Sequence, residues 1–162
     1  MPITAHQSLQ HMAWANARIF TAIQALPESV LTVYIANPEW TVAKLLQHIV
    51  DGAEWYQYCL TDRHDGWNKV LPTTMADVAI LQAQLASYDA AILAQADLDD
   101  ELLSVTMDDG STMPVLRSIL IAQSPHHATE HRAQLADALE AHAIAGIDLD
   151  RNDLWAFTTT LS

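Results

Sequence analysis

Apolar residues recur at steps of three and four along four long stretches of the chain. These stretches cover about residues 4–26, 41–60, 74–96 and 114–145. This spacing places the apolar side chains on one face of an α-helix, so each stretch is predicted to form an amphipathic helix. Four such helices, joined by connections of moderate length, predict an all-α fold: a four-helix bundle whose apolar faces meet in one core.

Residues that favour helix ends mark the limits of these stretches. Thr41 and Thr74 each precede an apolar stripe and are expected to cap the second and third helices. Pro114 is well placed for the first position of the fourth helix, where its missing N–H costs nothing. Gly146 is expected to close that helix, because glycine readily adopts the left-handed conformation of a C-terminal cap.

Three segments depart from the simple helical pattern. Residues 102–107 are rich in apolar and β-branched residues and lead to Asp109-Gly110, which predicts a tight turn and a short hairpin before the last long helix. Pro125 lacks a backbone donor and clashes with the preceding turn, so we expect a kink just before His126. The tail after residue 148 is expected to pack back on the bundle through its apolar residues, Leu154, Trp155 and Phe157.

His127 and His131 form an HxxxH pair in the fourth stretch. Residues four apart on a helix have Cβ atoms roughly 5–6 Å from each other, which allows two imidazoles to reach one metal ion. The pair interrupts an apolar stripe, where a buried polar group needs a partner. A metal ion is one such partner, and a hydrogen bond within the core is the alternative. His126 points about 100° away from His127 and is not expected to be a ligand.

Several other residues are less specific. His48 lies on the flank of the second helix's apolar face, one turn from Gly52. Gly52 either leaves room beside His48 or permits a close helix contact. Asp51 is more simply a surface carboxylate than a partner of the His48 ring, and Asn16 is expected to bond to a neighbouring helix. The histidines outside these helix faces are expected to be solvated: His6, His11, His64 and His142.

Composition excludes several classes of function. The 162 residues, of which 51% are hydrophobic, predict one domain over residues 1–162 with a substantial core. The net charge of −13, from 7 Lys+Arg and 20 Asp+Glu, argues against nucleic-acid partners and anionic membrane surfaces. The single cysteine, Cys59, permits no internal disulfide. Because neither a signal peptide nor an apolar run of about 20 residues is found, we expect a cytoplasmic protein without a membrane span.

Three segments together resemble the DinB/YfiT-like family of small four-helix metalloproteins. They are residues 13–18, 40–49 and 127–135, which read AWANAR, WTVAKLLQHI and HATEHRAQL. The first resembles the family's first-helix motif, the second resembles the family's second-helix segment, whose histidine is a metal ligand, and the third resembles the HxxxHRxQ segment that supplies two more ligands in the family. The resemblance extends over nearly the whole chain. The ordered combination is far more specific than any one segment.

This resemblance implies a divalent metal ion, nickel or zinc, held by His48, His127 and His131. Spacing alone does not select His48. The family also implies a homodimer and, in some relatives, a low-molecular-weight thiol that the metal activates. The chain differs from the family pattern in having Pro125 and His126 directly before the pair.

The leading hypothesis is therefore a metal-dependent enzyme that acts on a small molecule as a thiol-dependent S-transferase or isomerase. Three protein ligands with an open fourth position are typical of catalytic metal sites. No residue is assigned a catalytic role, and the chain contains no phosphate-binding glycine loop, GxSxG or CxxC motif. The alternatives are a stress-related metal-binding protein without catalysis and a metal-dependent hydrolase.

Overall fold

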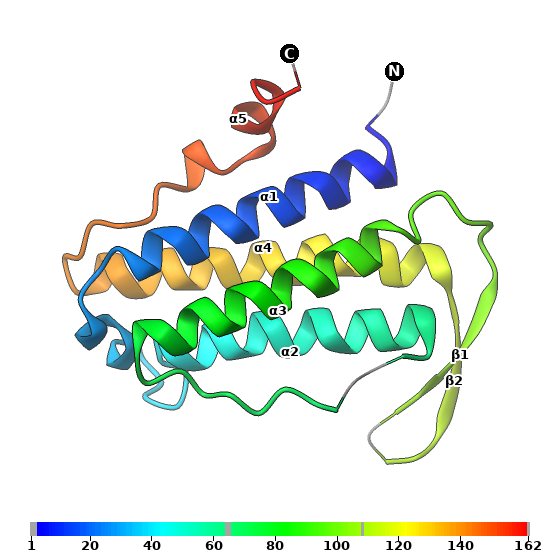
Figure 1. Ribbon diagram of the computed structural model, residues 1–162, viewed down its shortest axis with the longest axis horizontal. Helices are drawn as coiled ribbons and strands as arrows, with labels where there is room; N and C mark the ends of the chain where they lie inside the picture. Colours follow the sequence, from blue (N-terminus) through cyan, green and yellow to red (C-terminus); the bar gives the residue numbers. More distant parts are fainter. Residues whose placement is uncertain (1–2, 64–65, 108, 162) are drawn as a thin grey trace.

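Four long helices dominate the structure, a computed structural model (Figure 1). It describes residues 3–63, 66–107 and 109–161. The long helices are α1 (Ala5–Gln24), α2 (Val42–Thr61), α3 (Met75–Leu93) and α4 (Arg117–Ala141). α1 packs against α3 and α4, and α2 packs against the same two helices. This arrangement confirms the predicted all-α four-helix bundle.

The second and third helices begin at the predicted threonine caps. The Thr41 hydroxyl accepts a hydrogen bond from the Lys44 backbone N–H (3.2 Å), and the Thr74 hydroxyl accepts one from the Asp77 N–H (3.2 Å). Each bond satisfies a backbone donor that the first turn of a helix leaves without a partner. The sequence therefore places both helix starts correctly.

The apolar stripes meet in a single core between the four helices. Leu9 and Phe20 of α1, Leu46 of α2, Leu85 of α3 and Leu135 of α4 are all almost fully buried there. Burying one such side chain stabilises the fold by about 1.5–3 kcal/mol relative to leaving it exposed. Among the described residues, no helix has both the length and the apolarity that a membrane crossing requires.

A hairpin connects α3 to α4. It consists of β1 (Leu102–Thr106) and β2 (Thr112–Leu116), which pair antiparallel, with Ser104 opposite Pro114. This confirms the predicted hairpin, but the prediction that Pro114 starts the last helix is wrong. The Arg117 N–H donates a hydrogen bond to the Glu101 carbonyl oxygen (2.9 Å) at the base of the hairpin. From this pair onward, hydrogen-bonded and non-hydrogen-bonded residue pairs alternate along the two strands. In that alternation Pro114 occupies a position whose missing N–H would point away from β1, where proline is tolerated.

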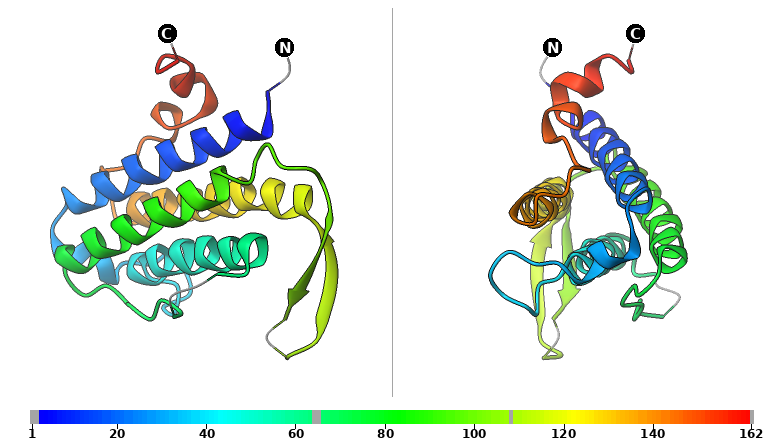
Figure 2. Two further views of the ribbon diagram at one scale, coloured as in Figure 1. Left: turned by 45° about the vertical axis from the view of Figure 1, so that its right-hand side comes forward. Right: turned by 90° about the vertical axis from the view of Figure 1, so that its left-hand side faces the viewer.

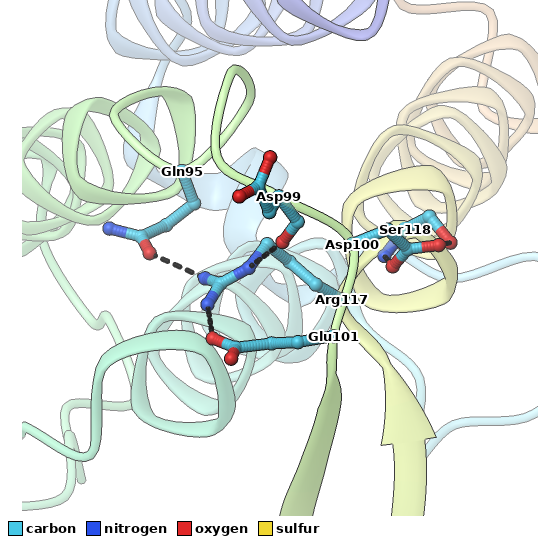
Figure 3. A network of polar contacts seen from close by, with 6 residues as sticks. All are labelled: Gln95, Asp99, Asp100, Glu101, Arg117 and Ser118. Atoms are coloured by element: carbon cyan, nitrogen blue, oxygen red, sulfur yellow. Dashed lines mark hydrogen bonds and ion pairs between the residues drawn. The ribbon is translucent and has the colours of Figure 1, made fainter.

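Arg117, the first residue of α4, ties the base of this hairpin to the end of α3 (Figure 3). Its Nε donates to the Asp99 carbonyl (3.1 Å), its Nη1 donates to Gln95 Oε1 (2.8 Å), and its Nη2 pairs with Glu101. All three nitrogens of this buried guanidinium therefore have partners, as a buried cation requires.

Leu116, the residue that precedes α4, has no side chain that can cap the helix. Instead, the Asp100 carboxylate accepts hydrogen bonds from the Ser118 N–H (2.9 Å) and hydroxyl (2.8 Å) (Figure 3). The helix continues without a break through Pro125, and the kink expected there stays a prediction. It ends at residue 141, earlier than expected, and Ala143 (φ 55°) takes the left-handed position predicted for Gly146.

After α4 the chain turns back and runs beside α1, on the side of that helix opposite α3, as Figures 1 and 2 show. The returning tail contains a short 3-10 helix, η2 (Leu149–Arg151), and a short α-helix, α5 (Leu154–Thr158). The ring of Phe157 is buried against His11 and Trp14, with ring centroids 5.7 and 5.5 Å away. Trp155 and Leu154 are exposed, so the expectation that they pack on the bundle is wrong.

Candidate metal centre

Three histidines from two helices converge in the interior of the bundle. α2 supplies His48, and α4 supplies His127 and His131. One ring nitrogen from each lies within 4.8 Å of the other two. His131 is buried and the other two are half-buried. The structure thus brings together the three residues that the family resemblance names as ligands.

The separation of the imidazole nitrogens fits a shared metal ion. Two nitrogens that each lie about 2.0–2.1 Å from one tetrahedral ion are about 3.3–3.4 Å from each other. His48 Nε2 and His127 Nε2 are 3.3 Å apart. The two rings already have the spacing that a common ion imposes, so binding requires little rearrangement of this pair.

Two of the three imidazoles are held in the form that binds metals. Burial, reinforced by the neighbouring His131 and His48, lowers the pKa of His127 to about 4. Burial also lowers the pKa of His48, and His131 and Lys44 add to the effect. Both rings are therefore neutral at pH 7. Because a metal must displace a proton from a charged imidazole, this neutrality favours binding.

Gln134 fixes the orientation of the third imidazole. Its Oε1 lies 2.7 Å from Nδ1 of His131, one helical turn earlier. An amide oxygen only accepts hydrogen bonds, so Nδ1 carries the proton and donates it. In the neutral form of the His131 ring, this tautomer leaves Nε2 as the nitrogen that can bind a metal, as in most histidine metal sites. Gln134 lies in the segment that resembles the family motif, and its bond to His131 is a role that the sequence did not predict.

Gly52 provides the space that one site histidine occupies. A Cβ atom at this position would lie 2.2 Å from Cε1 of His127 and 2.8 Å from its Nδ1. Of the two explanations offered by the sequence, room beside His48 and a close helix contact, the structure supports the second. The close contact is made by the His127 ring of the facing helix, α4.

Aromatic rings enclose the three histidines. The Trp40 ring packs edge-on against His48, with centroids 5.1 Å apart, and lies nearly parallel to His131 at 6.1 Å. Tyr56 packs edge-on against His127 at 5.7 Å. Beside His131, a groove of about 400 Å³ leads to solvent. The residues that line it are Ile35, Ala36, Asn37, Trp40, Leu45, Glu130, His131 and Gln134.

The other candidate residues lie outside this cluster. Asp51 accepts a hydrogen bond from Asn68 Nδ2 (2.9 Å), which makes it a loop anchor. His142 is exposed, as expected, and His126 is exposed and lies outside the cluster. His11 is half-buried and donates to the Asn152 carbonyl (2.9 Å), so its expected solvation is wrong. His64 lies outside the described residues.

Comparison with known protein families identifies the class to which this bundle belongs. The family model described as the DinB family matches residues 1–142. Because the match covers most of the 162 residues, the chain belongs to the DinB family. No curated protein matches the chain. Family membership and the three-histidine cluster together fit a DinB-like metal-binding protein.

Proposed function

We propose that the protein is a divalent-metal-dependent enzyme that acts as a thiol-dependent S-transferase or isomerase. The observation that supports the proposal best is the convergence of three imidazole nitrogens beside an open groove. His48, His127 and His131 would hold the ion. Neutral imidazole donors suit zinc or nickel. Three protein ligands leave a further coordination position for a small molecule, as in catalytic sites.

A divalent ion at these histidines would supply a Lewis acid that lowers the pKa of a thiol in the free position. The chain's own cysteine is unsuited to be that thiol, because burial raises the pKa of Cys59 to about 11 and keeps it protonated. The nucleophile would therefore be a separate low-molecular-weight thiol. In a transfer, the thiol proton passes to solvent, the sulfur bonds to an electrophilic carbon, and the leaving group departs with the bonding electrons.

The groove beside His131 would hold the electrophile. Its walls include the apolar side chains of Ile35, Trp40 and Leu45, which favour an apolar substrate body. Trp40 forms part of both the groove wall and the enclosure of His48 and His131, so a substrate against its ring would lie beside the ligand cluster.

Metal content tests the ligand set directly. We expect close to one divalent ion per chain in untagged protein purified without chelators, and a nearly complete loss in His48→Ala and in His127→Ala. Elemental analysis measures this content. His126→Ala is the matched control, because His126 is exposed, adjoins His127 and lies outside the cluster. Metal retained in both ligand variants would exclude the proposed site.

Turnover tests the enzymatic part separately. The metal-loaded protein is expected to accelerate the reaction of glutathione or cysteine with an activated aryl halide, and the His127→Ala variant is not. The rate of thiol consumption measures the effect. A protein that binds metal stoichiometrically but leaves a panel of cellular thiols unreacted would contradict the enzyme proposal and favour the non-catalytic metal-binding alternative.

Gln134→Leu is expected to weaken metal binding about 10–100-fold, the usual cost of losing a partner that orients a ligating imidazole. Gln134→Glu keeps an acceptor oxygen for His131 Nδ1 and is expected to retain the affinity. Competition with a chromophoric chelator measures both constants, and circular dichroism checks the fold. Equal affinities in the wild type and Gln134→Leu would show that this hydrogen bond does not support the site.

A further inference from the structure

A second groove lies between α1 and the returning tail, in the region where Figures 1 and 2 show the tail running beside the helix. It has a volume of about 630 Å³, within the usual range for small-molecule sites. None of the metal-site histidines lines it. Its lining residues are Trp14, Ala17, Arg18, Thr21, Ala22, Ala25, Gly146, Asp148, Arg151 and Asn152.

Arg18 is held in place with its terminal nitrogens unused. Its Nε donates to Asn152 Oδ1 (2.8 Å), and its guanidinium carbon lies 4.9 Å from the centre of the Trp14 ring. The hydrogen bond and the cation–π contact fix the plane of the guanidinium. Within residues 3–63, 66–107 and 109–161, Nη1 and Nη2 of Arg18 have no hydrogen-bond or ion-pair partner.

Arg151 lies on the same groove in a similar state. Its Nε pairs with Asp148 Oδ2 (3.2 Å), and its two terminal nitrogens likewise have no partner in the described part of the chain. By contrast, the terminal nitrogens of Arg117 and Arg132 are occupied by protein acceptors. Two of the chain's 7 basic residues thus line one hollow while their terminal nitrogens have no protein partner among the described residues, in a chain of net charge −13.

We propose that this groove binds a small organic carboxylate with an apolar body. A guanidinium fork matches the two oxygens of a carboxylate and binds them with paired charge-assisted hydrogen bonds. Two arginines against one aspartate leave the lining with a positive balance. Trp14 and the small side chains of Ala17 and Ala22 offer an apolar surface for the rest of the molecule. Part of the lining follows residue 142, beyond the residues that the family model matches.

Naphthoate and naphthylmethanol, which differ mainly in the carboxylate, form a suitable pair of probes. In an NMR titration of the full-length protein, naphthoate is expected to shift the amide signals of residues 14–25 and 146–152. The neutral alcohol is expected to bind at least about tenfold more weakly, because it cannot form charge-assisted hydrogen bonds with both forks. Arg18→Gln and Arg151→Gln are each expected to lower the naphthoate affinity about tenfold or more.

Arg63→Gln is the matched control and is expected to leave the affinity unchanged, because Arg63 is exposed and does not line this groove. Arg18→Gln also removes the bond to Asn152 and could loosen the tail. In that case the test of carboxylate binding rests on Arg151→Gln, because the Arg151 side chain is 80% exposed. Equal binding of acid and alcohol, unchanged affinity in Arg151→Gln, or shifts centred on His131 would each overturn the proposal.

Discussion

Gly52→Ala is expected to abolish metal binding while leaving the bundle folded. The new Cβ would lie 2.2 Å from Cε1 of His127, far inside contact distance. The obstructed atom is at the end of a side chain, so the ring can rotate away at lower cost than α2 and α4 can separate. Alanine also stabilises a helix interior by roughly 0.5–1 kcal/mol relative to glycine. The substitution therefore removes a ligand without removing stability.

Elemental analysis and urea unfolding of the metal-free protein measure these two effects separately. Gly146→Ala provides the matched control, since its added Cβ would crowd Leu26 Cδ1 (2.8 Å) at a distance from the histidines. That variant is expected to keep its metal. Full metal content in Gly52→Ala, or an unfolded Gly52→Ala protein, would contradict the assigned role of this glycine.

The bundle was predictable because its determinants are local. Apolar spacing and the caps at Thr41 and Thr74 act within a few residues along the chain, and the structure contains both. Pro114 was misassigned because a missing N–H is tolerated equally at a helix start and at the outward-facing position of an edge strand. The choice between the two depends on pairing with Ser104, across the hairpin.

The candidate site was predictable only in part, because some of its residues are brought together from distant parts of the sequence. The HxxxH spacing of His127 and His131 is a property of one helix and is readable from sequence. His48 lies 79 positions from His127, and only the family resemblance named it. The need for glycine at position 52 likewise comes from a side chain of the facing helix, His127, which occupies the space of a Cβ atom. Gln134 lies three residues after His131, so helical spacing alone places its amide next to the His131 ring.

Arg132→Ala is expected to produce a large loss of stability, about 3–5 kcal/mol, the usual cost of removing one partner from a buried charged network. Arg132 donates through Nη1 to Asn16 Oδ1 (2.6 Å), and Asn16 Nδ2 donates to Asp89 Oδ2 (2.9 Å). The three residues are buried and join α4, α1 and α3. Without the guanidinium, the core would contain an uncompensated carboxylate.

The stability lost in Arg132→Ala should depend on pH, because it depends on whether Asp89 is ionised. Burial raises the pKa of Asp89 to about 6, against the lowering effects of the Asn16 hydrogen bond and the Arg132 charge. A raised carboxyl pKa means that the folded state holds the proton more tightly, so stability falls as the pH rises from about 4 to 6. Removing Arg132 raises this pKa further. The deficit of the variant should therefore be larger at pH 7 than at pH 5, where Asp89 is mostly protonated.

Urea unfolding of the metal-free protein at both pH values measures this deficit. Arg151→Ala is the control, because its side chain is 80% exposed and its loss should change stability by no more than about 0.5 kcal/mol. Asp89→Asn in the Arg132→Ala background should recover part of the loss at pH 7, since it removes the charge that the guanidinium balanced. A deficit that is equal at both pH values and unaffected by Asp89→Asn would show that Arg132 stabilises the core by packing alone.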